Sequence, residues 1–209
     1  MFERSLKINF NDAAVCLGYG NMMYRFCGKP RIGYTIFENT DLYEDWAHQL
    51  SQLDAVWTFS EWGKKILAEK KINADVVPGG VNTSIFREMP ELRATARRDF
   101  NFVSVGKWEP RKNQELLVKA FCSEFKPTEN ARLYGIWNNP FIKENSESLA
   151  SKTAFAGHTV CALDKYNGNN GTIVVCPQLP SQKTMAQLFN QMDCAVFPYR
   201  AEGWCLPLM

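Results

Sequence analysis

The sequence predicts an α/β protein whose strands form parallel sheets, and three observations carry this prediction. Short runs of strand-forming residues alternate with amphipathic segments of about ten residues, long enough for a crossover helix. Several strands end in glycine- or proline-containing turns that open the next helix. The alternation occurs before and after a charged connector at residues 87–99, which indicates two sheets. Strands joined through helices are parallel, with right-handed crossovers.

The first half, residues 1–86, is expected to end its alternation at a turn containing Gly79 and Gly80. Ser60 and Glu61 mark the clearest boundary, because serine can cap a helix and an acidic first turn complements the helix dipole. The expected elements are a strand within 10–20, a strand at 32–37, a helix at 42–53, a strand at 55–59, a helix at 61–70 and a strand at 75–77.

The second half repeats the pattern after a connector that is expected to be partly helical. Asn113 and Ser181 are expected to cap two helices. The helix after Asn113 has an apolar face at helical spacing, which predicts core packing by Leu117, Ala120, Phe121 and Phe125. Strands are expected at 102–105, 132–137, 172–176 and 194–197, and the polar stretch at 138–171 is expected to be irregular.

The composition is that of an ordinary globular protein, with 45% hydrophobic and 22% charged residues in a chain of 209. The net charge of +2 is too small to indicate a nucleic acid or a charged membrane surface as the partner. Because the chain has no long apolar run and its first residues lack the apolar core of a signal peptide, we expect a cytoplasmic protein with no transmembrane segment. Peripheral membrane contact stays open.

The cysteines and histidines indicate no metal site. Seven cysteines, none in a CxxC pair and several within apolar runs, favour buried reduced thiols over disulfides or zinc ligands. His48 and His158 stand far apart without ligand-like neighbours, so each is expected to be a surface or hydrogen-bonded histidine.

The last stretch, residues 194–209, is predicted to be a buried strand that runs into a turn and then toward a helix beginning at Pro207. Open α/β sheets bind ligands at such turns, at the carboxyl ends of their strands. A helix N-terminus favours phosphate, Gly203 lets the backbone approach a ligand closely, and the Glu202 carboxylate can accept hydrogen bonds from hydroxyl groups. We therefore expect a ligand site in this turn.

A second candidate cluster spans residues 105–113, between a strand and a helix N-terminus. Gly106 permits close backbone approach, and Lys107 and Lys112 flank a tight proline turn. Two cations converging on one site would neutralise a diphosphate, and increasingly so as the diphosphate leaves. Lysine contacts phosphate as a point charge without the bidentate fork of arginine, and Arg111 is a further candidate. The plain alternative is a solvated basic loop.

The last stretch resembles the nucleotide-sugar signature of the retaining GT-B glycosyltransferases of the family 4 type. That motif is usually written E-G-F-G-L-P-x-x-E. The chain matches it at Glu202, Gly203, Trp204, Leu206 and Pro207 and has Cys205 where glycine is usual. The second glutamate of the motif would fall at position 210, past the end of the chain, so we expect a fragment.

Two further segments carry the resemblance. Lys107 and Lys112 fit the basic pair that the family commonly writes as G-R-x-x-x-x-K, with lysine in the first position instead of arginine. The turn from Pro78 to Asn82 is similar to the P-x-G-V-D segment that joins the two domains of the family, with asparagine instead of aspartate.

The resemblance implies an α/β fold of two Rossmann-like parallel-sheet domains (GT-B), both incomplete here. Residues 1–86 would be the C-terminal part of the N-terminal, acceptor-side domain. Residues 87–209 would be an incomplete C-terminal domain that binds a nucleotide sugar. The implied activity is a hexosyltransferase that moves a sugar from a UDP- or GDP-linked donor to a carbohydrate, lipid or protein acceptor, with retention and with no metal or other cofactor.

The resemblance also assigns roles residue by residue. Glu202 would be the catalytic residue near the transferred sugar. The donor diphosphate would be bound by Gly106, Lys107 and Lys112, and the donor sugar and phosphate by Gly203, Trp204, Cys205 and Leu206. Leu179 would line the base, and Glu38 and Asn39 would face the acceptor-side cleft.

Two other interpretations stay open. A chain cut at both ends could be catalytically inactive and act at most as a nucleotide-binding or partner-packing module, since truncated sheets expose apolar faces and unpaired edges. A related GT-B enzyme, such as an epimerase or a phosphorylase, would share the phosphate contacts. The sequence does not distinguish uridine from guanosine donors and leaves the acceptor open.

Overall fold

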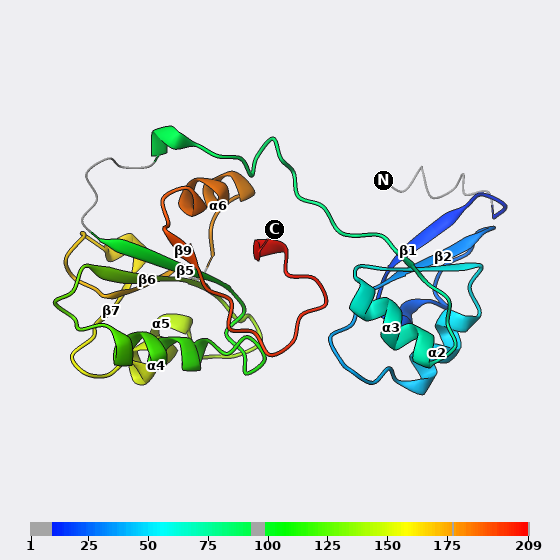
Figure 1. Cartoon of the computed structure of the whole chain (residues 1–209), viewed down its shortest axis with the longest axis horizontal. Helices are drawn as coiled ribbons and strands as arrows, with labels where there is room; N and C mark the ends of the chain where they lie inside the picture. The colour runs from blue at the N-terminus through cyan, green and yellow to red at the C-terminus, as the bar shows by residue number, and fades with distance from the viewer. Residues whose placement is uncertain (1–9, 93–98, 177, 209) are drawn as a thin grey trace. The chain divides into compact units, whose positions relative to one another are not determined.

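The computed structural model describes residues 10–92, 99–176 and 178–208. By their mutual contacts the residues form two compact units. One comprises the chain up to Gly80 together with Ala201–Pro207, and the other comprises Val81–Arg200 with Leu208. Each unit contains one parallel sheet (Figure 1). The contacts thus divide the chain after Gly80 and group Ala201–Pro207 with the first unit, whereas the boundary predicted after residue 86 stays a prediction.

The first unit is built on four parallel strands in the order β1-β2-β3-β4. These strands are β1 (Ala14–Gly18), β2 (Arg31–Thr35), β3 (Ala55–Thr58) and β4 (Asp75–Val76). The helices are α2 (Glu44–Ser51) and α3 (Glu61–Glu69), with a 3-10 turn η1 (Gly20–Met22) after β1. Every element expected in this half is present, because its strands are rich in strand-forming residues and its helices have buried apolar positions such as Leu50 and Leu67.

Ser60 caps α3 as predicted. Its Oγ accepts a hydrogen bond of 3.1 Å from the backbone N–H of Gly63, which satisfies one of the amides that a helix N-terminus leaves unpaired. Glu61 stands in the first turn, where its charge complements the helix dipole. Here local sequence chemistry and the fold agree.

The second unit is built on five parallel strands in the order β7-β8-β6-β5-β9. The strands are β5 (Phe100–Gly106), β6 (Ala131–Trp137), β7 (Val160–Ala162), β8 (Ile173–Cys176) and β9 (Cys194–Ala195). The helices are α4 (Gln114–Glu124), α5 (Ser146–Thr153) and α6 (Gln182–Phe189), with 3-10 turns η2 (Pro90–Leu92), η3 (Leu163–Lys165) and η4 (Leu206–Leu208). Helices α4 and α5 cover one face of the sheet and α6 lies on the other (Figure 1).

The core of the second unit lies between its sheet and α4 and α5. It contains Val118, Phe121, Leu133, Ala150 and Ile173. Ala120, predicted to face this core, is exposed instead, since the buried face of α4 is formed by Gln114, Val118, Phe121 and Cys122. The buried face is therefore rotated from the predicted one, and Leu117 and Phe125 pack at its margin.

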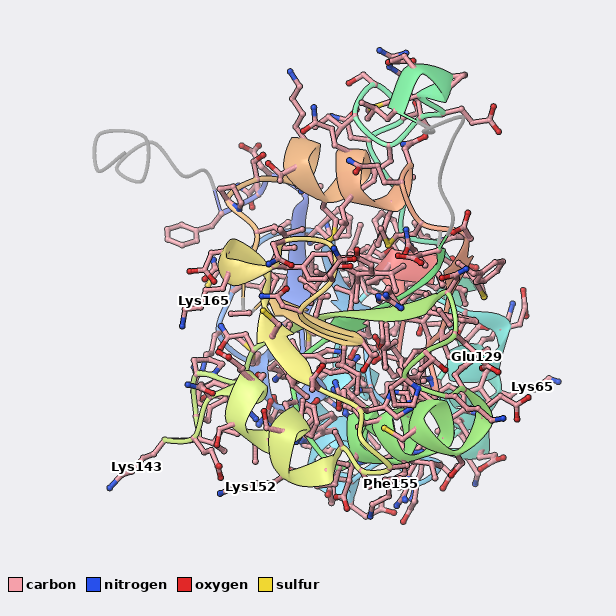
Figure 2. The ribbon with its side chains drawn as sticks, turned by 90° about the vertical axis from the view of Figure 1, so that its left-hand side faces the viewer. Lys65, Glu129, Lys143, Lys152, Phe155 and Lys165 are labelled. Carbon is pink, nitrogen blue, oxygen red and sulfur yellow. The ribbon has the colours of Figure 1, made fainter. Side chains whose placement is uncertain are left out.

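Residues 138–171, expected to be irregular, contain α5, β7 and η3. Helix α5 is capped by Asn145, whose Oδ1 accepts a 2.8 Å hydrogen bond from the N–H of Ser148. The charged side chains Lys143, Lys152 and Lys165 extend away from the ribbon into solvent (Figure 2). The predicted loop at residues 167–171 is present, and the Asn170 side chain donates to the carbonyl of Lys165 at 2.8 Å.

The end of the chain differs from expectation in two details. Strand β9 is short and lies at the edge of the sheet, so Cys194 is half-buried and Ala195 exposed, where a buried strand was predicted. Instead of a helix beginning at Pro207, the described residues form the 3-10 turn η4. In the connector, η2 gives the expected partial helicity, and Arg93, Arg97 and Arg98 lie outside the described residues, as do Met1–Lys7 and Met209.

All seven cysteines are free, as expected. Only Cys122 and Cys161 are buried, and Cys27 is exposed, so the prediction of buried thiols holds for two of them. His158 is buried and hydrogen-bonded through both ring nitrogens, to Thr172 Oγ1 at 3.0 Å and to the carbonyl of Phe125 at 2.8 Å. His48 is exposed on α2. No described helix has both the length and the apolar character that crossing a membrane requires.

Candidate functional site

The order of the strands in the second unit singles out the carboxyl ends of β5 and β9. From β5 the chain crosses through α4 to β6 on one side, whereas β9, on the other side of β5, is reached through α6. The two crossovers lie on opposite faces of the sheet (Figure 1). In open parallel sheets a reversal of strand order of this kind opens a crevice beyond the strand ends, where ligands bind. The residues that leave β5 and β9 are therefore the place to look for a site.

Residues 196–200, which follow β9, are bonded directly to the loop between β5 and α4. The N–H of Arg200 donates to the carbonyl of Arg111 at 2.9 Å, Asn113 Nδ2 donates to the carbonyl of Pro198 at 3.3 Å, and Arg200 Nη2 donates to Asn113 Oδ1 at 3.5 Å. The Tyr199 hydroxyl donates to the carbonyl of Val105, within β5. We name residues 106–113 and 198–200 together the strand-end cluster. It contains Gly106, Lys107 and Lys112, whose assignment to a donor diphosphate stays a prediction.

Gly106 ends β5 with a backbone φ of +146°, a conformation that residues with a side chain rarely adopt. A Cβ at this position would lie 3.0 Å from the Tyr199 hydroxyl oxygen and 3.6 Å from Cδ of Lys112. The sequence predicted that a glycine here would let a ligand approach. In the structure the group that approaches Gly106 is the Tyr199 side chain.

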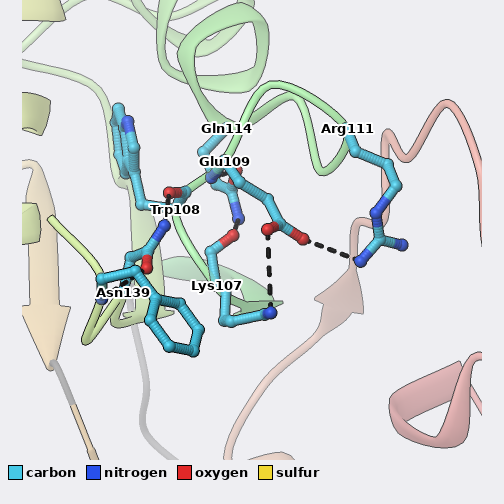
Figure 3. A network of polar contacts seen from close by, with 7 residues as sticks. Lys107, Trp108, Glu109, Arg111, Gln114 and Asn139 are labelled. Carbon is cyan, nitrogen blue, oxygen red and sulfur yellow. Dashed lines mark hydrogen bonds and ion pairs between the residues drawn. The ribbon is translucent and has the colours of Figure 1, made fainter.

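Lys107 and Arg111 share one carboxylate. Glu109 lies between them, with Oε2 at 3.8 Å from Lys107 Nζ and Oε1 at 2.7 Å from Arg111 Nη2 (Figure 3). Lys107 Nζ also lies 5.5 Å from the centre of the Phe141 ring. Glu109 keeps the two cations on the same side of the loop. Sequence reasoning missed it, although the alternation of basic and acidic residues was visible.

Gln114 fixes the backbone of this loop from beneath. It is only 1% exposed, and its Nε2 donates to the carbonyl of Lys107 at 2.6 Å while its Oε1 accepts from the N–H of Glu109 at 3.3 Å (Figure 3). Asn139, from the loop after β6, donates to the carbonyl of Trp108 at 2.9 Å. The loop is thus bonded to the fold along its length, which pre-organises the side chains that it carries.

Lys112 rests on an aromatic ring. Its Nζ lies 4.1 Å from the centre of the Tyr199 ring, within the range of a cation–π interaction. Residues 107–112 contain three cations and the single carboxylate of Glu109, a formal net charge of +2 (three minus one) at the N-terminus of α4. A helix N-terminus adds positive partial charge. The strand-end cluster therefore attracts anions.

Asn113 does not cap α4, contrary to the sequence prediction. It adopts the left-handed conformation, with φ 62° and ψ 30°, and its side chain makes no cap hydrogen bond. Its Nδ2 donates to the carbonyl of Pro198 instead. Asparagine tolerates this conformation better than other residues with a side chain. Asn113 thus connects the two parts of the strand-end cluster.

The residues of the E-G-F-G-L-P-like motif belong to the first unit by their contacts. A Cβ on Gly203 would lie 2.4 Å from Ile36 Cγ1 and 2.9 Å from the carbonyl of Phe37. The ring of Trp204 lies 6.1 Å from that of Phe59. Glu202 and Cys205 are half-buried and Leu206 is exposed. By their contacts these residues belong to the first unit, whereas Gly106, Lys107 and Lys112 belong to the second.

The remaining candidates follow strand ends. Glu38, half-buried, and Asn39, exposed, come shortly after β2. Leu179 is half-buried between β8 and the Ser181 cap of α6, whose Oγ accepts from the N–H of Thr184 at 3.1 Å as predicted. Within residues 10–92, 99–176 and 178–208, no group of three or more His, Cys, Asp or Glu residues is arranged to hold a metal ion.

No protein-family model and no curated protein matches this sequence. Solved structures do resemble it in fold. OtsA in its apo form superposes with a TM-score of 0.69 at 13% identity, over 99% of this chain and 56% of OtsA. The chain has the GT-B fold. This confirms the expected architecture of two α/β sheets of the type found in glycosyltransferases.

Two further structures share the GT-B fold with the chain. Trehalose-6-phosphate from E. coli bound with UDP-2-fluoro glucose superposes with a TM-score of 0.67 at 12% identity, over 99% of this chain and 56% of that one. TarM superposes with a TM-score of 0.59 at 12% identity, over 99% of this chain and 40% of TarM. The chain thus spans about half the length of the structures it matches.

Proposed function

We propose that this chain is the part of a glycosyltransferase that carries a donor diphosphate site, and that the transferase moves a hexose from a nucleoside diphosphate to an acceptor. The observation that carries the proposal is the strand-end cluster. It combines Lys107, Lys112 and the N-terminus of α4 at the strand-order reversal of a parallel sheet. This is an arrangement suited to a phosphate-bearing ligand.

In the proposed reaction the cations act on the leaving group. As the bond between sugar and diphosphate breaks, negative charge grows on the diphosphate, and Lys107 and Lys112 stabilise that charge more in the transition state than in the bound donor. Arg111 shares Glu109 with Lys107 and is a further candidate cation for the diphosphate. Because these groups are held by the loop before the donor arrives, little reorganisation opposes the reaction.

The other roles rest on the motif. We assign Glu202 to the transferred sugar as the catalytic residue, and residues 203–206 to the sugar hydroxyls and the phosphate. Leu179 is assigned to the base, and Glu38 and Asn39 to the acceptor side. We further propose a UDP- or GDP-linked donor, retention of configuration, and a reaction without a metal, in which the cations of the chain neutralise the diphosphate.

The compared structures support the proposal by analogy. One contains UDP-2-fluoro glucose, and another concerns glycosyltransfer with retention by trehalose-6-phosphate synthase. At 12–13% identity these properties belong to those proteins and come to this chain only as part of the proposal.

Titration of the 209-residue chain with UDP and GDP by calorimetry tests the diphosphate site. Lys112→Ala should weaken binding by about 1–3 kcal/mol, as the loss of a charge-assisted hydrogen bond does. Lys119→Ala is the matched control. This variant also removes one lysine charge, but from the exposed surface of α4, where Lys119 pairs with Glu115 at 2.5 Å. It should leave the affinity for UDP and GDP unchanged. Equal affinities for Lys112→Ala and the unmodified chain would remove the phosphate assignment.

A transfer assay separates the proposal from its main alternative, an inactive chain that only binds nucleotide or packs against a partner. Incubation with UDP- and GDP-linked hexoses, followed by detection of free nucleoside diphosphate, reports transfer to acceptor or water. Turnover that is lost in Glu202→Gln supports the enzyme. Nucleotide binding without turnover at any donor would reduce the conclusion to a binding module.

A further inference from the structure

We propose that Tyr199 is a positioning residue of the diphosphate site, acting on donor phosphate through Lys112. This inference rests on the proposed function. Tyr199 comes from the turn after β9, while Lys112 comes from the loop after β5, and neither lies near the other in the sequence. The structure places the lysine ammonium 4.1 Å from the centre of the tyrosine ring.

The Tyr199 ring is fixed by a hydrogen bond of its hydroxyl and by a backbone hydrogen bond of the next residue, Arg200. The hydroxyl donates to the carbonyl of Val105, the penultimate residue of β5. Glycine at residue 106 leaves room for that hydroxyl, as a Cβ there would lie 3.0 Å from the oxygen. The backbone of Arg200 donates to the carbonyl of Arg111 at 2.9 Å. The ring is therefore held against both β5 and the loop that carries Lys112.

A lysine needs such support more than an arginine does. Its charge sits at the end of a flexible four-carbon stem, and a site that uses it as a point charge must restrict that stem. The face of an aromatic ring attracts an ammonium group and confines it to a small region. By confining Lys112 before the donor binds, Tyr199 reduces the ordering that phosphate binding must impose.

The same observation gives Gly106 a second purpose. In the sequence it is the first residue of a basic loop, where a missing side chain lets a phosphate approach. In the structure its missing side chain makes room for the Tyr199 hydroxyl. Gly106 therefore makes room for the Tyr199 hydroxyl, and the Tyr199 ring in turn positions the Lys112 ammonium group.

A double-mutant cycle tests the coupling. The affinity of the 209-residue chain for UDP and for GDP is measured by calorimetry in the unmodified protein, Tyr199→Leu, Lys112→Met and the double variant. Tyr199→Leu should weaken binding roughly 3- to 30-fold in the unmodified background, the range of a cation–π interaction. In the Lys112→Met background the same change should have less than about a 2-fold effect, because the ring then has no cation to position.

Two other outcomes would separate a failure of the Tyr199 role from a failure of the proposed function. An equal loss from Tyr199→Leu in both backgrounds would overturn the positioning role and leave the diphosphate site standing. If neither nucleotide binds the unmodified, folded chain, the proposed function itself fails, and this inference with it.

A series of phenylalanine analogues covers the case in which Tyr199→Leu does not fold. Tyr199→Phe keeps the ring face and loses the hydroxyl bond to Val105, so it is the reference against which the rest of the series is compared. Progressive fluorination of that phenylalanine weakens the negative face of the ring at almost constant size. Affinity should then fall stepwise with fluorination, and an affinity that does not change along the series would refute the cation–π role.

Discussion

The hydroxyl of Tyr199 occupies the space that a side chain on Gly106 would need. A Cβ at residue 106 would lie 3.0 Å from that oxygen, a distance tighter than nine in ten Cβ contacts. The backbone φ of +146° at Gly106 separately disfavours any residue with a side chain. Two causes, one steric and one conformational, therefore require glycine at the end of β5, and they can be separated experimentally.

Gly106→Ala should lower the free energy of unfolding by about 1–3 kcal/mol, because it combines backbone strain with the collision against Tyr199. Gly168→Ala is the matched control. Gly168 also has a positive φ, of 93°, but a Cβ there would have no neighbouring atom within 4 Å. Urea unfolding followed by circular dichroism measures both variants. The excess loss in Gly106→Ala over Gly168→Ala is the contribution of the Tyr199 hydroxyl.

Adding Tyr199→Phe to Gly106→Ala should restore part of the lost stability, since it removes the oxygen that the new methyl group meets. Equal destabilisation by the two alanine variants, with no rescue by phenylalanine, would show that only the backbone conformation matters at residue 106.

The elements that the sequence predicted correctly are those whose signals are local. Ser60 and Ser181 each stand directly before an amphipathic segment and each bond the third residue after them, which needs nothing from elsewhere in the chain. Continuous apolar runs such as Ile173–Cys176 give the central strands in the same way. The two parallel α/β sheets follow from the order of these elements, whereas the GT-B fold was expected from the resemblance of residues 202–207 to a family motif.

The elements that were missed depend on partners distant in sequence. Asn113 has the same local signal as Ser181, yet its side chain bonds Pro198, which lies 85 residues away. Helix α5 has few apolar positions and β7 is only three residues long, so neither gives a strong local signal. Likewise the basic pair at 107 and 112 was visible in the sequence, whereas the Tyr199 ring beneath Lys112 was not.

The stability of Asn113 variants should depend on the left-handed backbone conformation of residue 113 and on its side-chain bond to Pro198, and not on capping of α4. Asn113→Gly keeps the backbone conformation and removes the side-chain bonds to Pro198 and Arg200, so we expect a small loss of stability. Asn113→Ala adds strain at φ 62°, and should lower the free energy of unfolding by about 1 kcal/mol more than the glycine variant. Urea unfolding of both variants measures the difference.

Ser181→Ala provides the comparison for a true cap. Its Oγ accepts from the N–H of Thr184, so its loss should lower the free energy of unfolding by about 1 kcal/mol. Glycine at an N-cap is nearly as good as serine, so Ser181→Gly should recover most of that loss. If Asn113→Gly and Asn113→Ala proved equally stable, the left-handed conformation would not be what residue 113 contributes.

Glu144 gives the chain an acid-sensitive contact at the start of α5. Its carboxylate accepts from the ammonium group of Lys152 at 2.5 Å and from the hydroxyl of Ser148 at 2.6 Å. Lys152, and then Ser148, lower the pKa of Glu144 below its ordinary value. A group whose pKa is lower in the folded state contributes stability above its unfolded pKa, which is about 4.3 for glutamate. That contribution is lost as the pH falls through the folded-state pKa.

Glu144→Gln should therefore unfold at lower urea concentration than the unmodified chain near pH 7, and the difference should shrink as the pH falls below about 4.3 and through the lowered pKa of folded Glu144. The difference should also fall in high salt, because Lys152 is exposed and the pair is screened. Glu147→Gln is the control, since it removes a carboxylate from the first turn of α5, three residues after Glu144, and leaves the Glu144–Lys152 pair intact. A Glu144→Gln effect that persisted undiminished at about pH 3 would mean that the side-chain amide disturbs packing, and that the charge of Glu144 contributes nothing.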